Sequence, residues 1–231
     1  MSLWPLQVFD PSEEFAVLER KLPHWSQAGT VCFITWRALD SMPKSVLNRW
    51  YADREDWLRR RGIDPKGADW KSQFDQLDPD LRGEFVRTFS ERWHRSLDAC
   101  HGVCVLKRSD LSEIVSESLM KFDGERYELT DYVVMPNHVH LMAAFVSEEG
   151  MLAQCEGWKH FQAVQLYRQL GASGRFWQQD GFDHLVRSVE QFEALRRYIA
   201  RNPERARLRA GEFRHYSKDL TKIAGWESSP K

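Results

Sequence analysis

The chain has 231 residues, which is enough for one large domain or for a small domain that carries an insertion. Hydrophobic residues make up 42% and charged residues 29%, the balance of a globular protein, and no apolar run is long enough for a membrane-spanning helix. The formal net charge of −1 does not indicate a nucleic-acid-binding protein, and the N-terminal sequence MSLWPLQVFDPSEE lacks the pattern of a secretion signal. We therefore expect a cytoplasmic protein.

The four cysteines, Cys32, Cys100, Cys104 and Cys155, are few and irregularly spaced. The sequence CHGVC matches neither a zinc knuckle nor the C-x-x-C-H pattern of haem attachment. We expect reduced, partly buried thiols rather than a metal site.

A strand and a long helical stretch come first along the chain. Residues 30–37, TVCFITWR, are rich in β-branched and aromatic residues and predict a strand. From about residue 40 to residue 95 the sequence is charged, and apolar residues recur at three- and four-residue spacing, which predicts helices. We interpret residues 40–95 as a helical insertion within a single domain that spans residues 1–231. Its tryptophans are most simply core residues: Trp50, Trp57, Trp70 and Trp93.

Strands and helices alternate in the rest of the chain. A short strand is predicted over residues 101–108 and an amphipathic helix over residues 109–124. RYELTDYVVMP and HVHLMAAFV predict two strands, or one strand bent at Pro136. A helix is predicted over residues 151–170, and SVEQFEALRRYIARN predicts a last helix that stops at Pro203. This order predicts an α+β sandwich with one mostly antiparallel sheet and helices packed on one face.

A pair of histidines stands inside one of these apolar strands. His138 and His140 are two residues apart, and alternate side chains of a strand point to the same face. The two imidazoles therefore project side by side, while Val139 and Leu141 take the other face. Two fixed nitrogen donors suit a divalent cation that keeps open positions. A His-x-His pair alone is more often structural or incidental than a metal site, so the pair needs partners elsewhere in the chain.

The last predicted helix offers such partners. Phe192, Leu195 and Ile199 form an apolar stripe at helical spacing. Tyr198 lies on the flank of this stripe, and Asn202 follows four residues later on the same side. Tyr198 could instead border the core with its hydroxyl in water, and Asn202, followed by a proline, could close the helix.

Several motifs occur in one order along the chain. They are T-W-R at residues 35–37, M-P-N-H-V-H at 135–140, W-K-x-F at 158–161, F-W-Q at 176–178, F-D-H-L-V-R at 182–187 and Y-I-x-x-N-P at 198–203. This order resembles the REP-associated tyrosine transposases, in the wider group of HUH single-strand transposases and relaxases. The resemblance covers roughly residues 30–38 and 97–210. It implies the ferredoxin-like sandwich of the HUH endonucleases.

The resemblance also implies an activity, a metal-dependent endonuclease and strand transferase for transposition and recombination of DNA. Its substrate would be single-stranded DNA at or beside a short REP hairpin. The resemblance implies an Mg²⁺ or Mn²⁺ ion held by His138, His140 and Asn202, and Tyr198 as the nucleophile that forms a 5′-phosphotyrosine intermediate. The base that activates the phenol is not identified. A monomer and a homodimer both fit, with Tyr198 acting in cis or in trans.

A segment that includes the last helix is basic. Residues 158–214 contain eleven Lys or Arg against six Asp or Glu, a net charge of +5, which predicts either a basic face or a solvated helical surface. Single-stranded DNA needs cations along its backbone and aromatic rings for its bases. The predicted DNA-binding residues are Lys159, Arg168, Arg175, Trp177, Arg187, Arg197 and Arg201. His160 and His184 could belong to the outer shell of the site.

Two other functions stay open. The chain could be a catalytically inactive, domesticated protein that binds single-stranded or hairpin DNA. It could also be an unrelated metallohydrolase that uses the histidine pair and water, with Tyr198 in a structural role.

Overall fold

The computed structural model describes residues 6–10, 12, 16–18, 24–179 and 182–220. The first five residues, which belong to the N-terminal stretch without a secretion pattern, lie outside this part of the chain. Two compact units are present: residues 40–103 form one, and the chain before and after them forms the other. A single domain with an insertion over residues 40–95 stays a prediction. In the described part of the chain, no helix has the length and apolar character needed to span a membrane.

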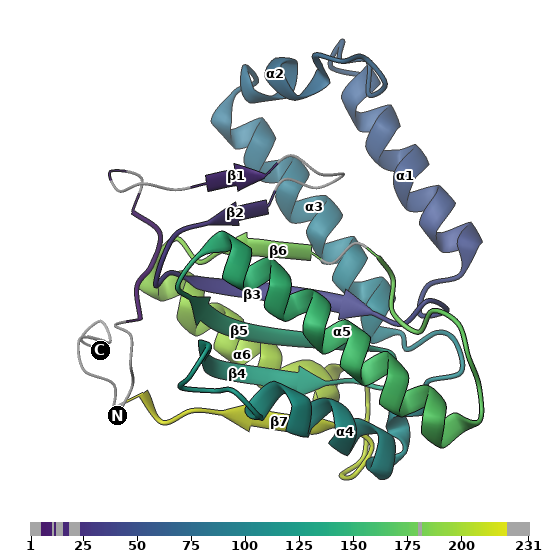
Figure 1. Ribbon diagram of the computed structural model, residues 1–231. Coiled ribbons are helices and arrows are strands. Elements are labelled where there is room, and N and C mark those ends of the chain that lie inside the picture. The colour runs from purple at the N-terminus through teal and green to yellow at the C-terminus, as the bar shows by residue number, and fades with distance from the viewer. Residues whose placement is uncertain (1–5, 11, 13–15, 19–23, 180–181, 221–231) are drawn as a thin grey trace. The chain divides into compact units, whose positions relative to one another are not determined.

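The larger unit is built on a five-stranded sheet in the order β6-β3-β5-β4-β7, with every neighbouring pair antiparallel (Figure 1). The mostly antiparallel α+β fold predicted from the sequence is therefore confirmed. The strands are β3 (Val31–Arg37), β4 (Tyr127–Val134), β5 (His138–Phe145), β6 (Phe182–Leu185) and β7 (Arg214–Ser217). A separate two-stranded sheet pairs β1 (Ala16–Leu18) with β2 (His24–Ser26).

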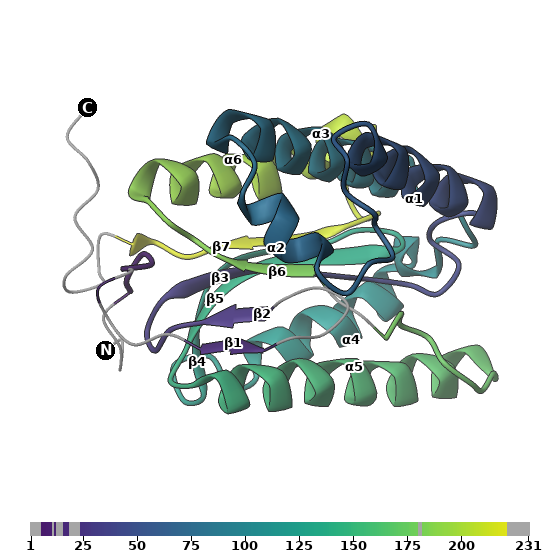
Figure 2. The same cartoon turned by 90° about the horizontal axis from the view of Figure 1, so that it is seen from above.

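Helices cover both faces of the five-stranded sheet, whereas the sequence predicted helices on one face (Figure 2). On one face, α4 (Ser109–Met120) and α5 (Glu148–Leu170) pack over the apolar residues of β5 that alternate with the histidines. On the other face, α6 (Val189–Arg205) buries Phe192 and Ile199. The prediction was wrong because the histidine-bearing face is itself apolar further along β5, at Met142 and Ala144, and this part also needs a cover.

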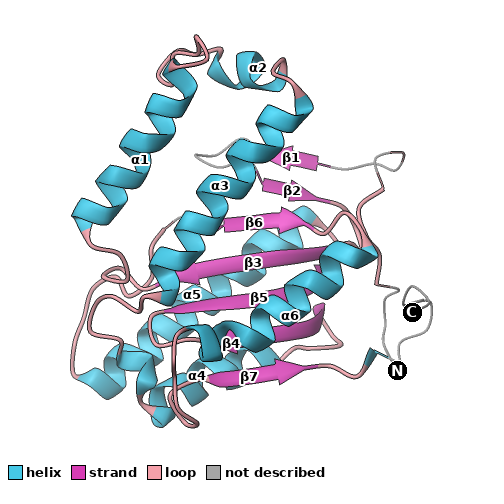
Figure 3. Ribbon diagram, turned by 180° about the vertical axis from the view of Figure 1, so that it is seen from behind, coloured by secondary structure: helices cyan, strands magenta, loops and turns pink. Residues whose placement is uncertain are grey.

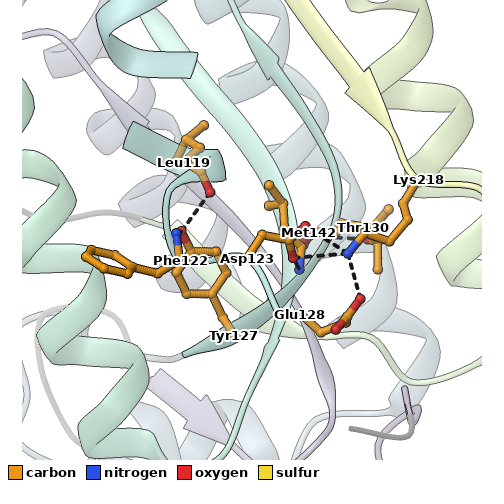
Figure 4. A network of polar contacts seen from close by, with 9 residues as sticks. Leu119, Phe122, Asp123, Tyr127, Glu128, Thr130, Met142 and Lys218 are labelled. Carbon is orange, nitrogen blue, oxygen red and sulfur yellow. Dashed lines mark hydrogen bonds and ion pairs between the residues drawn. The ribbon is translucent and has the colours of Figure 1, made fainter. Parts of the chain in front are cut away.

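A partly buried polar cluster fastens the chain after β7 to β4 (Figure 4). Lys218 donates hydrogen bonds to Glu128 (2.6 Å) and Asp123 (3.0 Å), and its backbone N–H donates to the Thr130 carbonyl (2.7 Å). Burial opposes the charge of Lys218, but the hydrogen bonds to the two carboxylates outweigh it and raise the pKa of the lysine. The register of β4 against β5 shifts at Thr130, as in a β-bulge. Beyond this shift, Asp131 pairs with Met142 and therefore lies on the face that α6 covers.

Two local predictions fail for backbone reasons. The strand predicted over residues 101–108 is absent, because Cys104 adopts a left-handed conformation (φ 54°) and the chain continues as a short 3-10 helix, η1 (Val105–Lys107). The last helix does not stop at Pro203 but continues to Arg205. Proline removes one backbone donor, but a later bond, from Ala206 N–H to the Asn202 carbonyl (3.1 Å), still closes the last turn.

The smaller unit is helical, as predicted for this stretch. Its helices are α1 (Lys44–Arg59), α2 (Trp70–Asp75) and α3 (Pro79–Asp98). The Asp78 side chain accepts a hydrogen bond from the Asp80 N–H and caps α3, with Pro79 in the favoured first position. The unit has its own apolar cluster, and the tryptophans expected in a core pack against or beside it: Trp50, Trp57, Trp70 and Trp93.

Candidate functional site

Helix α6 lies over one face of the five-stranded sheet (Figure 3). The antiparallel register gathers polar side chains on this face. His138 and His140 of β5 pair with Arg37 and Thr35 of β3, and residues directly opposite each other share a face. Both histidines are fully buried. Their shared orientation agrees with the strand alternation read from the sequence.

The two imidazoles lie side by side. Their ring centroids are 4.7 Å apart with an interplanar angle of 75°, and a ring nitrogen of His138 lies within 4.8 Å of a ring nitrogen of His140. Asn137 Oδ1 accepts a hydrogen bond from Nδ1 of His138 (2.8 Å), and Thr35 Oγ1 lies 2.7 Å from Nδ1 of His140. Sequence reasoning did not foresee these two contacts. Adjacency to His138 could have suggested Asn137, but nothing local links Thr35 to a histidine 105 residues later.

The phenol of Tyr198 reaches this histidine pair from α6. Its hydroxyl lies 3.2 Å from Nε2 of His140, and the two ring centroids are 5.2 Å apart. The tyrosine is half-buried, and the guanidinium of Arg205 lies 5.4 Å from the centroid of its ring. The structure therefore brings together three side chains that the sequence placed in one site, while their catalytic roles stay predictions.

Helix α6 is capped at its start and tied to the sheet by one arginine. The Ser188 side chain accepts a hydrogen bond from the Gln191 N–H and caps its start (3.1 Å). Arg196 donates from Nε to the buried carboxylate of Asp131 (3.1 Å) and from its terminal nitrogen to Ser217 Oγ (2.6 Å). Because the Asp131 carboxylate is buried, its ion pair with Arg196 holds α6 against β4 and β7. The same contacts fix the position of Tyr198.

Asn202, the predicted third metal ligand, is fully buried in α6, one turn after Tyr198. Because the helix continues to Arg205, Asn202 does not close it, and the capping role considered from the sequence does not apply. Its role as a metal ligand stays a prediction.

The predicted DNA-binding cations divide between the two helical layers. Arg197 and Arg201 are exposed on α6, and Arg187 is exposed just before it. In contrast, Lys159 and Arg168 lie on α5, which packs on the opposite face of the sheet. Exposed Arg175 follows α5, so the +5 segment does not form one continuous basic face.

Trp177, also predicted to contact DNA, is a core residue. Its side chain is 3% exposed, and its ring meets those of Trp36 and Phe176 edge-on, with centroids 6.2 and 4.7 Å away. A ring enclosed in this way has no open face on which an unpaired base could stack.

His184, on β6, is separated from His140 by a single side chain, that of Phe33. It is opposite Phe33 on neighbouring strands, and the Phe33 ring lies between the rings of His184 (5.3 Å) and His140 (5.4 Å). Burial, with a smaller effect of the positive charge of Arg187, lowers the pKa of His184 to about 4. His184 is therefore neutral at neutral pH. His160, on α5, is exposed in the other layer.

This low pKa predicts a loss of stability in mild acid. An unfolded histidine has a pKa of about 6.5 and takes up a proton at higher pH than folded His184 does, so protonation favours the unfolded chain as pH falls from about 6.5 to 4. We expect His184→Gln to remove about 2 kcal/mol of the stability difference between pH 7.5 and pH 4.5, after allowance for partial exposure. Urea unfolding of the wild-type and His184→Gln proteins at the two pH values measures this stability difference. An equal loss of stability in the wild-type and His184→Gln proteins would show that His184 is already protonated in the native protein at pH 4.5.

The comparisons with known proteins give one structural similarity. No family model matches the chain, and no curated protein matches it. Among solved structures, the chain is similar to a REP-associated tyrosine transposase bound to a REP hairpin, with 12% sequence identity and a TM-score of 0.38. The similarity covers 89% of this chain and 95% of that chain.

Proposed function

We propose that the protein is a metal-dependent enzyme that nicks and rejoins single-stranded DNA through a 5′-phosphotyrosine intermediate on Tyr198, in the manner of an HUH transposase. One observation carries the proposal: a phenol from a late helix lies 3.2 Å from one of two paired imidazoles on a central strand. A hydrolase that activates water would not need a tyrosine at this place. A purely structural tyrosine would not need a histidine pair.

The donor set fits a divalent metal ion. Metal-binding histidines usually donate the other ring N–H to an oxygen of the protein. Here Nδ1 of each ring meets an oxygen, from Asn137 or from Thr35. His138 and His140 would hold Mg²⁺ or Mn²⁺ through Nε2, with Asn202 as the proposed third ligand. A bound ion would polarise the scissile phosphodiester and offset its charge.

The chain itself supplies the nucleophile. The Tyr198 phenol loses its proton as its oxygen forms a bond to phosphorus, the bond from phosphorus to the 3′-oxygen breaks, and that oxygen takes up a proton and leaves as a 3′-hydroxyl. The freed hydroxyl of another strand can reverse the reaction, so rejoining needs no nucleotide cofactor. The phenol oxygen lies 3.2 Å from Nε2 of His140. One lone pair serves one partner, so a hydrogen bond that this nitrogen accepts from the phenol and metal binding by the same nitrogen would exclude each other.

The DNA would run along α6. Arg197 and Arg201 are one turn apart and exposed on the helix that carries Tyr198, and Arg37 adds a fixed charge opposite His138. Cations at these places suit a phosphodiester backbone.

If the DNA runs along α6, cations on α6 should contribute to DNA affinity and cations on α5 should not. We expect the double variant Arg197→Ala/Arg201→Ala to weaken binding of a single-stranded hairpin oligonucleotide by about 10-fold and to lower the salt dependence by about 0.7 for each phosphate that the protein no longer neutralises. Its matched control is Lys159→Ala/Arg168→Ala on α5, expected to leave affinity nearly unchanged. Fluorescence anisotropy over a range of salt concentrations measures both. An equal loss of affinity in the control would place the DNA elsewhere.

A covalent trapping assay tests the proposed reaction. The protein is incubated with single-stranded hairpin DNA and Mn²⁺ and then denatured, and we expect a protein–DNA adduct that survives denaturation. Cleavage without an adduct would instead support a metallohydrolase. Binding without cleavage would support an inactive DNA-binding protein.

A further inference from the structure

The backbone of Asn137 is fixed independently of the contact between its side chain and His138. It ends the turn between β4 and β5, and its backbone carbonyl accepts a hydrogen bond from the Ala38 N–H (2.7 Å) just after β3. Its side chain is 1% exposed. The amide oxygen therefore meets the ring of His138 from a fixed backbone position, in surroundings from which water is excluded.

This hydrogen bond selects one form of the His138 ring. An amide oxygen only accepts hydrogen bonds, so Nδ1 of His138 carries the proton. In the neutral imidazole the lone pair then lies on Nε2, which is the atom that a metal ion needs. The opposite tautomer would leave two acceptors facing each other in a buried site, which is unfavourable.

Thr35 contacts Nδ1 of His140 as Asn137 contacts Nδ1 of His138. Its hydroxyl lies 2.7 Å from Nδ1 across the ladder between β3 and β5, and Thr35 is 3% exposed. A hydroxyl can donate or accept. If it accepts, Nε2 of His140 carries the lone pair and receives the hydrogen bond of the Tyr198 phenol. Both rings then have the same tautomer.

We propose that Asn137 and Thr35 are positioning residues that hold His138 and His140 in the tautomer protonated on Nδ1 and so prepare both Nε2 atoms for metal binding. The inference rests on the proposed function, because it assigns a purpose to the outer hydrogen bonds of that site. Metal affinity then depends partly on two residues that are not ligands, one in the turn before β5 and one on the neighbouring strand.

Two measurements on the metal-free protein test this proposal. Nitrogen-15 NMR of the histidine side chains reports the tautomer, and we expect a protonated Nδ1 on His138 and on His140. Calorimetry with Mn²⁺ and no DNA reports metal affinity. We expect Asn137→Ala and Thr35→Val each to lower affinity by about 10- to 100-fold, since removal of a hydrogen-bond partner behind a metal ligand commonly has this effect. Asn137→Asp keeps an acceptor and should retain affinity.

A second buried threonine provides the matched control. Thr30 is buried next to the start of β3, and its hydroxyl donates to Gln27 (2.9 Å), so Thr30→Val makes the same chemical change away from the histidines. It should leave Mn²⁺ affinity unchanged. Should Asn137→Ala fail to fold, the wild-type tautomer and the Asn137→Asp and Thr35→Val variants still decide the question.

The outcomes separate the two proposals. A wild-type His138 protonated on Nε2, or wild-type affinity in Asn137→Ala, overturns the positioning role even if the adduct forms. Weakened Mn²⁺ binding in both variants, without an adduct in the wild type, supports the positioning role and contradicts the proposed reaction. A wild type that binds no Mn²⁺ contradicts both.

Discussion

Replacement of Tyr198 by Phe is expected to abolish the covalent protein–DNA adduct, with a decrease of at least about 1000-fold, and to leave Mn²⁺ affinity unchanged or increased. The first effect follows because no other atom of the side chain can attack phosphorus. The second follows because the phenol does not hold the ion. Its hydrogen bond to Nε2 of His140 competes with the ion, so its removal could only strengthen binding. Denaturing gel electrophoresis and calorimetry measure the two effects.

Tyr132→Phe is the matched control for this variant. Tyr132 also has a hydrogen-bonded hydroxyl, 2.6 Å from Ser116 Oγ, but it lies on the sheet face that α4 and α5 cover. Adduct formation should survive in this variant. A Tyr198→Phe protein that still forms the adduct would show that another residue is the nucleophile. If its Mn²⁺ affinity fell sharply, Tyr198 would be a metal ligand.

Replacement of His138 by Ala is expected to lower Mn²⁺ affinity by at least about 100-fold, because removal of a ligand should exceed the 10- to 100-fold effect of removing a hydrogen-bond partner behind it. Adduct formation should fall with it at limiting Mn²⁺ and recover in part at high Mn²⁺. Tyr198→Phe should show no such recovery. Calorimetry and an adduct titration against Mn²⁺ distinguish a missing ligand from a missing nucleophile.

His160→Ala is the control, because His160 is exposed on α5 in the other layer and should not affect Mn²⁺ binding. Urea unfolding of His138→Ala should accompany the assay, since the change also opens a cavity in a buried strand. Wild-type Mn²⁺ affinity in a folded His138→Ala protein would contradict the assignment of His138 as a ligand.

Elements with a regular period could be predicted from the sequence. Alternation along β5 gave the shared face of His138 and His140, and helical spacing put Tyr198 on the flank of the buried stripe of α6. Both are local consequences of backbone geometry. The link between the tyrosine and the histidines came from the order of motifs in a known family, not from the periods.

Interactions that depend on tertiary packing could not be predicted. The pairing of Thr35 with His140 depends on the register of two strands that are far apart in the chain. A patch of charge in the sequence likewise does not show on which side of the sheet each helix packs, and Lys159 and Arg197 lie on opposite sides. Trp177 shows the same limit, because composition does not distinguish a ring that binds a base from one that fills a core.

The most direct test of the account is mass spectrometry of the trapped complex. After reaction of the wild-type protein with single-stranded hairpin DNA and Mn²⁺, digestion should yield a peptide in which Tyr198 carries a nucleotide through its 5′-phosphate. DNA that is cleaved but leaves no nucleotide on the protein, or a nucleotide attached to a different residue, would contradict it.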